Sequence, residues 1–157
     1  MCNHPVPAVD AIIETAGGIV LVERRFPPFG LALPGGFVEN GETVEAAVRR
    51  EAMEETGLEL EDLQLFGVYS DPERDPRRHT VSIVFTARGR GVARPGDDAG
   101  GIRVLPAADI GDSLAFDHSR IVADYLSRRG AAESGEKGDG TFHSGGNEGI
   151  MERKLEK

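Results

Sequence analysis

Three glutamates near the middle of the chain are spaced so that they could bind a metal ion together. Glu51, Glu54 and Glu55 follow i, i+3, i+4 spacing, which on a helix places the three side chains on one face. Like charges so placed repel, at a cost of roughly 0.2–0.5 kcal/mol per pair. Mg²⁺ and Mn²⁺ prefer carboxylate oxygens and leave positions open for substrate phosphates. The cluster therefore predicts a site for one of these ions, with the number of ions left open.

The helical phase of this segment favours a functional site over a solvated glutamate-rich surface. An apolar stripe begins with Val44, Ala47 and Val48, and the three glutamates continue it toward the C-terminal end. Charge runs on helices are most often solvated, but an ordinary surface helix keeps its carboxylates off its apolar face. Exceptions to such patterning cluster at functional sites. Thr43 is the expected N-cap, and Gly57 the expected left-handed residue that ends the helix.

Residues 36–58, GFVENGETVEAAVRREAMEETGL, resemble the signature of the Nudix hydrolases, which cleave nucleoside diphosphates linked to another group. The signature reads Gly, five residues, Glu, seven residues, Arg-Glu, an aliphatic residue, any residue, Glu-Glu, any residue, Gly and an aliphatic residue. Ala52 and Leu58 take the aliphatic places. The fixed positions are filled by Gly36, Glu42, Arg50, Glu51, Glu54, Glu55 and Gly57. A match at every fixed position is very specific.

The resemblance implies roles for these residues. Glu51, Glu54 and Glu55 would hold the metal, and the Gly36 carbonyl would be a further ligand. Glycine suits that role because it lets the backbone approach an ion closely. By helical phase Arg50 is expected to point away from the carboxylate stripe, so we assign it to an ion pair with Glu42 that ties the preceding loop to the helix. A contact from Arg50 to a substrate phosphate is the alternative.

The general base has two candidates. In this family it is either a glutamate of the signature helix or an acid from a separate loop, so Glu51 is our first choice and Asp98 the second. Asp97 and Asp98 beside glycine are also ordinary turn formers. Many relatives carry a glutamate shortly after the Gly-Asp-Asp-Ala stretch, whereas this chain continues with Gly100 and Gly101. That departure weakens the case for a catalytic loop.

Blocks outside the signature resemble the ADP-ribose pyrophosphatase branch of the family and cover most of residues 6–129. They are VDAIIE, GGIVLVERRFPPFGLALPGGFVENGET, YSDPERDPRRHTVSIVF and LAFDHSRIVADYL. Pro72 lies where a proline accompanies ADP-ribose specificity in related enzymes. This resemblance implies hydrolysis of ADP-ribose to AMP and ribose 5-phosphate. The alternatives are a nucleoside triphosphate-sanitising or other Nudix pyrophosphohydrolase, and an inactive nucleotide-sensing module, which the intact glutamates disfavour.

Cations and aromatic residues near the predicted strand ends could bind such a substrate. We expect phosphates and a terminal ribose to be bound by Arg24, Arg25, Arg74, Arg77 and His79. Phe37 could stack on adenine, as could Phe26 and Phe29, although aromatic residues beside prolines more often serve packing.

The amino-acid composition limits the kinds of molecule that we expect this protein to bind. The 157 residues carry 27 acidic and 18 basic side chains, a net charge of −9, which argues against general nucleic-acid binding. The single cysteine, Cys2, allows no internal disulfide and fits a reduced cytosol. No signal peptide and no stretch of roughly 20 apolar residues is visible. We expect a soluble, cytoplasmic protein that acts on a small nucleotide and binds no membrane, with a homodimer left open.

Alternating apolar runs predict the elements that position the site. Strands are expected at 9–14, 18–25, 31–33, 63–70, 80–87 and 102–105, with a tight loop at 34–36 and a second helix at 117–129, where Asp117 is the candidate cap. Interleaved strands and helices indicate an α/β or α+β fold with a mixed sheet, the α/β/α sandwich that the resemblance also implies. Residues 1–129 would form this domain, and 130–157, rich in Gly, Ser and Glu, a disordered tail.

Overall fold

The computed structural model describes residues 4–97 and 99–135. The elements in chain order are β1 (Val6–Thr15), β2 (Gly18–Arg24), β3 (Gly30–Ala32), β4 (Gly35–Phe37), α1 (Val44–Thr56), β5 (Glu59–Tyr69), β6 (Thr80–Arg90), β7 (Ala99–Leu105), a short 3₁₀ helix (Ala107–Asp109) and α2 (His118–Gly135). Within the described residues, the strands form one seven-stranded sheet with the path β3-β2-β1-β6-β5, while β4 pairs with β1 and β7 with β2.

The sheet is mixed, as the sequence predicted. β1 and β6 run parallel from the pair Val6 and Thr80 to the pair Glu14 and Arg88, and the other paired strands are antiparallel. β1 is central, and its inner residues are buried on both faces. Such a strand requires cover on both sides of the sheet.

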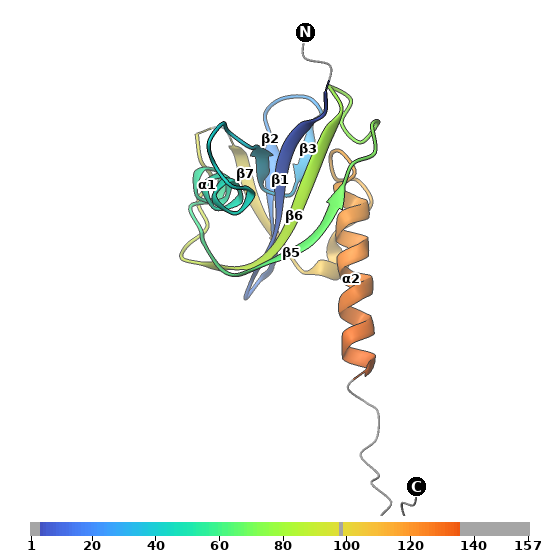
Figure 1. The fold of residues 1–157 in the computed structure, drawn as a ribbon. Helices are drawn as coiled ribbons and strands as arrows, with labels where there is room; N and C mark the ends of the chain where they lie inside the picture. The colour runs from blue at the N-terminus through green and yellow to red at the C-terminus, as the bar shows by residue number, and fades with distance from the viewer. Residues whose placement is uncertain (1–3, 98, 136–157) are drawn as a thin grey trace, which may run out of the picture.

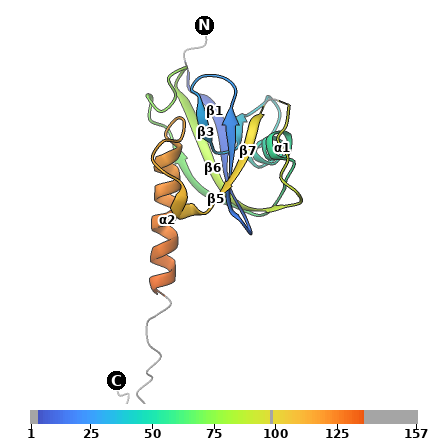
Figure 2. The same ribbon diagram turned by 180° about the vertical axis from the view of Figure 1, so that it is seen from behind.

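Two apolar cores provide that cover. Val9, Ala11 and Ile13 of β1 pack with Ala47, Val48 and Ala52 of α1, whereas Ile12 packs with Ile121 and Val122 of α2. Successive side chains of a strand point to opposite faces, so β1 supplies both cores. The two helices therefore lie on opposite faces of the sheet (Figures 1 and 2). The predicted α/β/α sandwich is confirmed.

Helix α1 begins and ends where the sequence predicted. The Thr43 hydroxyl accepts a hydrogen bond from the Ala46 N–H over 3.1 Å. Gly57 adopts the left-handed conformation, with φ of 68°, and donates its N–H to the Met53 carbonyl. Both bonds satisfy backbone groups that the helix itself leaves unpaired, so they fix where the helix begins and ends. The ends of the helix in turn set the position of the glutamates along the helix axis.

The structure differs from the sequence prediction at several boundaries. Residues 34–36 were expected to form only a tight loop, yet β4 occupies most of this segment because Gly35 and Gly36 pair with β1. Helix α2 continues past Arg129 to Gly135, where Arg129 and Glu133 form an i, i+4 ion pair. The rest of the predicted tail, 136–157, lies outside the described residues. Among the described helices, none is long and apolar enough to cross a membrane.

Candidate functional site

The glutamates of α1 occupy different environments. Burial, followed by the negative charges of Glu51 and Asp10, raises the pKa of the Glu55 carboxyl to about 8. The Gly35 N–H donates to Glu55 Oε2 over 2.9 Å and opposes that shift. Burial also raises the pKa of Glu51, whereas the side chain of Glu54 is largely exposed. Buried carboxylates with raised pKa values are a common property of functional sites.

The two glycines of β4 let the backbone approach these carboxylates. A Cβ atom on Gly36 would lie 2.3 Å from Glu51 Oε1, and one on Gly35 would lie 2.2 Å from the Val9 carbonyl oxygen. Any side chain at Gly36 would thus occupy the space of the Glu51 carboxylate. The strand is paired with β1, which fixes its distance from the helix. Gly36 therefore lies directly against the Glu51 carboxylate because glycine has no side chain to come between them.

Arg50 forms the ion pair that the sequence predicted. Its Nη2 and Nε donate to the Glu42 carboxylate over 2.7 and 3.1 Å, and this hydrogen bonding lowers the pKa of Glu42 and raises that of Arg50. Its Nη2 also donates to the Phe37 carbonyl over 3.1 Å. The loop before α1 is thereby held to the helix, as expected.

The expectation that Arg50 points away from the carboxylate stripe was wrong. Its Nη1 lies 2.9 Å from Glu51 Oε1 and 3.2 Å from Glu54 Oε2. The Cα direction follows the helical phase, but an arginine side chain is long enough to curl back over the neighbouring face. Arg50 consequently neutralises part of the charge on the glutamates and bridges them to Glu42.

The donor set fits a divalent cation in its chemistry. In the described part of the chain, no three acidic, histidine or cysteine side chains converge as ready ligands. The reason is visible in the contacts, since Glu51 and Glu54 turn toward Arg50, and Glu55 toward the Gly35 N–H. The glutamate carboxylates are nevertheless hard oxygen donors that lie beside Gly35 and Gly36 of β4. Burial disfavours the charged form of Glu51 and Glu55 unless a cation offsets it.

A cavity of about 210 Å³ opens beside Glu55, and neither Glu51 nor Glu54 is among the described residues that line it. Glu55, Gly35 and Gly36 line it on the α1 side. Five of the six predicted substrate residues also line it, namely Arg24, Arg25, Phe37, Arg74 and Arg77. His79 lies outside this cavity, with its Nε2 3.1 Å from the Ser70 carbonyl oxygen. Asp98 lies outside the described residues.

Two of the predicted cations are held over aromatic rings in the cavity. Arg77 forms two hydrogen bonds to Asp75, of 3.0 and 2.9 Å, which raise its pKa, and lies 5.2 Å from the centre of the Phe116 ring and 5.6 Å from that of Phe37. Arg24 lies 4.6 Å from the same Phe116 ring and donates to the Pro28 carbonyl. Burial, and then the charge of Arg77, lower the pKa of Arg24. Two guanidinium groups held beside each other suit an anionic ligand.

Arg74 has a different environment from the accessible cation that we expected. It is buried, and its Nε and Nη2 donate to the two carboxylate oxygens of Asp117 over 3.0 and 2.7 Å. Its Nη1 donates to the Thr80 hydroxyl over 2.8 Å. The guanidinium is thus committed to protein partners. Asp117, the expected side-chain cap of α2, instead accepts from Arg74, while its backbone carbonyl accepts the first helical hydrogen bonds.

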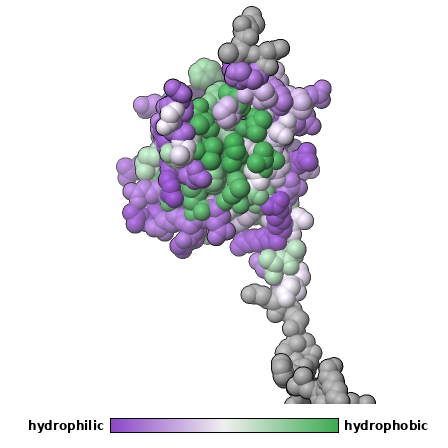
Figure 3. Space-filling view, in the orientation of Figure 1, coloured by the Kyte–Doolittle hydropathy of each residue, from purple (hydrophilic) through white to green (hydrophobic). Residues whose placement is uncertain are grey.

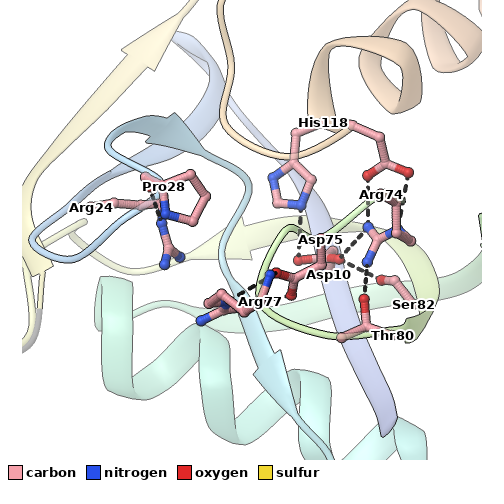
Figure 4. Close-up of polar contacts among 10 residues, drawn as sticks. Asp10, Arg24, Pro28, Arg74, Asp75, Arg77, Thr80, Ser82 and His118 are labelled. Carbon is pink, nitrogen blue, oxygen red and sulfur yellow. Dashed lines mark hydrogen bonds and ion pairs between the residues drawn. The ribbon is translucent and has the colours of Figure 1, made fainter. Parts of the chain in front are cut away.

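Sequence reasoning missed several residues that line the cavity. Asp10, Asp75, Phe116 and His118 all face it, and Figure 4 shows Asp10 and His118 pointing toward each other beside Arg74. An acid inside the apolar run VDAIIE was the one available signal for Asp10. Phe116 and His118 follow a loop, where no periodicity marks them. Phe116 has φ of 56°, an uncommon conformation for a bulky residue that is often retained at functional sites.

The fold, the capped helix with its glutamates, and the two glycines of β4 beside them define the class of protein. The chain belongs to the NUDIX domain family, whose sequence model matches residues 4–125. The predicted family is confirmed. Nudix hydrolases generally use divalent metal ions.

Individual relatives narrow the comparison. The chain is 50% identical over 126 residues to a Methanocaldococcus jannaschii protein named ADP-ribose pyrophosphatase, covering 78% of this chain and 74% of that one. It also resembles the NUDIX domain of Shewanella oneidensis NrtR, solved in complex with ADP ribose, with a TM-score of 0.72, 25% identity and coverage of 80% of this chain and 89% of that one. A MutT/nudix family protein from Enterococcus faecalis gives a TM-score of 0.73 at 28% identity, covering 82% of this chain and 63% of that one.

Proposed function

We propose that this protein hydrolyses ADP-ribose to AMP and ribose 5-phosphate. The observation that carries the proposal is one cavity that joins the Glu55 carboxylate and Gly36 to the guanidinium groups of Arg24 and Arg77. A nucleoside diphosphate linked to a sugar needs both features, because a metal must reach its phosphates while cations hold the remaining charge. The 50% identical relative that is named ADP-ribose pyrophosphatase supports the same substrate.

The metal ion we assign is Mg²⁺ or Mn²⁺. Glu51, Glu54 and Glu55 would hold it with the Gly36 carbonyl, as hard oxygen donors suit these ions. When bound, such an ion neutralises charge that develops on phosphate oxygens and lowers the pKa of a coordinated water. Arg50 contacts Glu51 and Glu54, and its two hydrogen bonds to Glu42 hold its guanidinium beside the residues that would bind the ion.

The reaction requires a base, and Glu51 is our assignment for it, with Asp98 as the second candidate. A water molecule attacks one phosphorus of the diphosphate, its proton passes to the carboxylate, and the phosphoanhydride P–O bond breaks. Each product keeps one phosphate. Glu51 suits this role because burial raises its pKa, which strengthens the carboxylate as a base. Phe37 is positioned on the cavity wall, where an adenine ring could stack on it.

The substrate proposal is tested by comparing kcat/KM for ADP-ribose, ATP and 8-oxo-dGTP on one Mg²⁺-loaded preparation. We expect ADP-ribose to be preferred by at least about a hundredfold, because hydrogen bonds to the second sugar discriminate strongly. Arg24→Gln and Arg77→Gln should raise KM for ADP-ribose about tenfold, with Arg88→Gln, an exposed arginine on β6, as the control. A preference for a triphosphate would overturn the substrate while leaving the metal chemistry intact.

We further propose that the protein forms a homodimer through the uncovered part of its sheet. Leu65 and Val68 of β5 are 64% and 58% exposed, and they pair with Phe85 and Ile83 on the α1 face. Figure 3 shows a broad apolar area on this side of the molecule. Monomers rarely expose large apolar patches, and a closed dimer brings the same patch of each copy together, which would bury both.

Sedimentation of the whole chain tests the dimer. Leu65→Lys and Val68→Lys should each yield a monomer, whereas Val92→Lys, at an exposed apolar residue beyond β6, should not. A wild-type protein that stays monomeric at about 100 µM would contradict the proposal, since a specific interface of standard size binds more tightly than this.

We also assign the protein to the cytoplasm, which its single cysteine suits.

A further inference from the structure

A buried polar cluster lies beneath the candidate site and has no role in the chemistry described above. Asp10 on β1 and His118 at the start of α2 are 7% and 3% exposed. His118 Nε2 lies 3.5 Å from Asp10 Oδ1, and Ser82 donates its hydroxyl hydrogen to Asp10 Oδ2. Arg74 Nη2 lies 3.8 Å from the same carboxylate (Figure 4). Burying such groups costs stability compared with apolar residues of similar volume, so their presence beside the cavity needs a reason.

The other ring nitrogen of His118 faces the backbone that leads into β4. Nδ1 accepts a hydrogen bond from the Leu33 N–H over 2.9 Å. A nitrogen that accepts from a backbone N–H carries no proton, so the ring proton lies on Nε2, toward Asp10. The Leu33 N–H therefore sets the tautomer of the ring, and the Asp10 carboxylate, 3.5 Å from Nε2, lies on the side of the protonated nitrogen and favours this orientation.

Leu33 begins the segment 33–36, which enters β4 and leads directly to the proposed metal-binding groups. The Pro34 carbonyl accepts from the Ala11 N–H over 2.9 Å, and the Gly35 N–H donates to Glu55. A Cβ atom on Gly35 would lie 2.4 Å from Asp10 Oδ1, so Asp10 also limits the position of this residue directly. The segment 33–36 is thus held by β1 and by α2.

We propose that Asp10 and His118 are positioning residues for the metal site: together they fix the segment 33–36 so that Gly35 and Gly36 lie against Glu55 and Glu51. This inference rests on the metal assignment in the proposed function. It predicts that loosening the His118–Leu33 bond weakens metal binding even without substrate. Outer partners of metal ligands commonly contribute tenfold to a hundredfold in metal affinity.

The test compares His118→Asn with His118→Gln in substrate-free protein, using electron paramagnetic resonance to measure Mn²⁺ binding. Asn places an amide oxygen near the position of Nδ1 and can still accept from Leu33, whereas Gln reaches the position of Nε2 and cannot. We expect Gln to lower Mn²⁺ affinity about tenfold or more and Asn to stay within about threefold of wild type. Equal affinities in the two variants would overturn the proposal.

Two further measurements separate positioning from general stability. Tyr69→Phe removes another tether of α2, the 2.7 Å bond from Tyr69 to Asp124, and should leave Mn²⁺ affinity unchanged. With saturating metal, His118→Gln should change KM for ADP-ribose less than about twofold, while the metal concentration for half-maximal activity rises. Nitrogen NMR should show an unprotonated Nδ1 in wild-type His118, and a protonated Nδ1 would contradict the assignment. If wild-type protein binds no Mn²⁺, the metal assignment itself fails, independently of His118.

Discussion

Arg50 and Glu42 are joined by two hydrogen bonds, of 2.7 and 3.1 Å, while the same guanidinium reaches Glu51 over 2.9 Å. One side chain thus connects the loop before α1 to the glutamates of the helix. This arrangement makes Arg50 both a structural tie and a cation in direct contact with two of the glutamates that we propose as metal ligands.

Replacing Arg50 with Ala should destabilise the protein. Glu42 and Glu51 would lose their common cation, so we expect the free energy of unfolding to fall by ~2 kcal/mol, which thermal melts can detect. Arg90→Ala is the control, because its ion pair with Glu59 is largely exposed and should contribute little. An unchanged melting point together with a steep rise in KM would instead identify Arg50 as a phosphate contact.

Replacing Glu55 with Gln should abolish most activity without harming the fold. The change keeps the size of the side chain but removes a metal-binding charge, so kcat should fall by on the order of a hundredfold or more. Near-normal turnover in this variant would contradict the metal site. Glu45→Gln, in the first turn of the same helix, serves as the control for a charge change on α1.

The stability of the metal-free protein should depend on pH through Glu55. Its pKa is raised from 4.5 to about 8 in the folded protein, so the folded state binds more protons than the unfolded state between these values. The contribution of Glu55 to the free energy of unfolding is therefore greatest near and below pH 4.5, and it falls as the pH rises toward 8. Denaturant unfolding in EDTA should show a loss of roughly 2 kcal/mol between pH 6 and pH 8 from this group. Glu55→Gln should remove most of that slope, and an identical slope in the variant would refute the assignment.

Replacing Gly36 with Ala should weaken metal binding more than it affects stability. The added Cβ would meet the end of the Glu51 side chain at 2.3 Å, and a flexible side chain can move away at small cost. We expect the melting temperature to change little and Mn²⁺ affinity to fall at least about tenfold, because a ligand is displaced. Gly111→Ala is the matched control, since a Cβ there contacts nothing within 4 Å. Retained Mn²⁺ affinity would show that Gly36 and Glu51 need not lie in contact.

The sequence alone determined the features that depend on neighbours along the chain. The caps at Thr43 and Gly57 and the mixed sheet were predicted, because helix ends and side-chain periodicity are local properties. The joint role of Glu51, Glu54 and Glu55 as metal ligands stays a prediction. The signature also identified the family. The pairing of Arg50 with Glu42 could be predicted for the same reason, because the two residues are close in the sequence.

Only the tertiary structure decided which distant residues share the cavity. Asp10, Arg74 and His118 lie far apart in the chain and meet because β1, the loop before β6 and the start of α2 converge there. Local sequence patterns do not indicate which distant residues will be in contact. For this reason Arg74 was interpreted as a substrate contact, and His118 was not identified as a residue of the cavity. The reach of the Arg50 side chain onto Glu51 was equally invisible, because helical phase fixes where a side chain starts and packing decides where a long one ends.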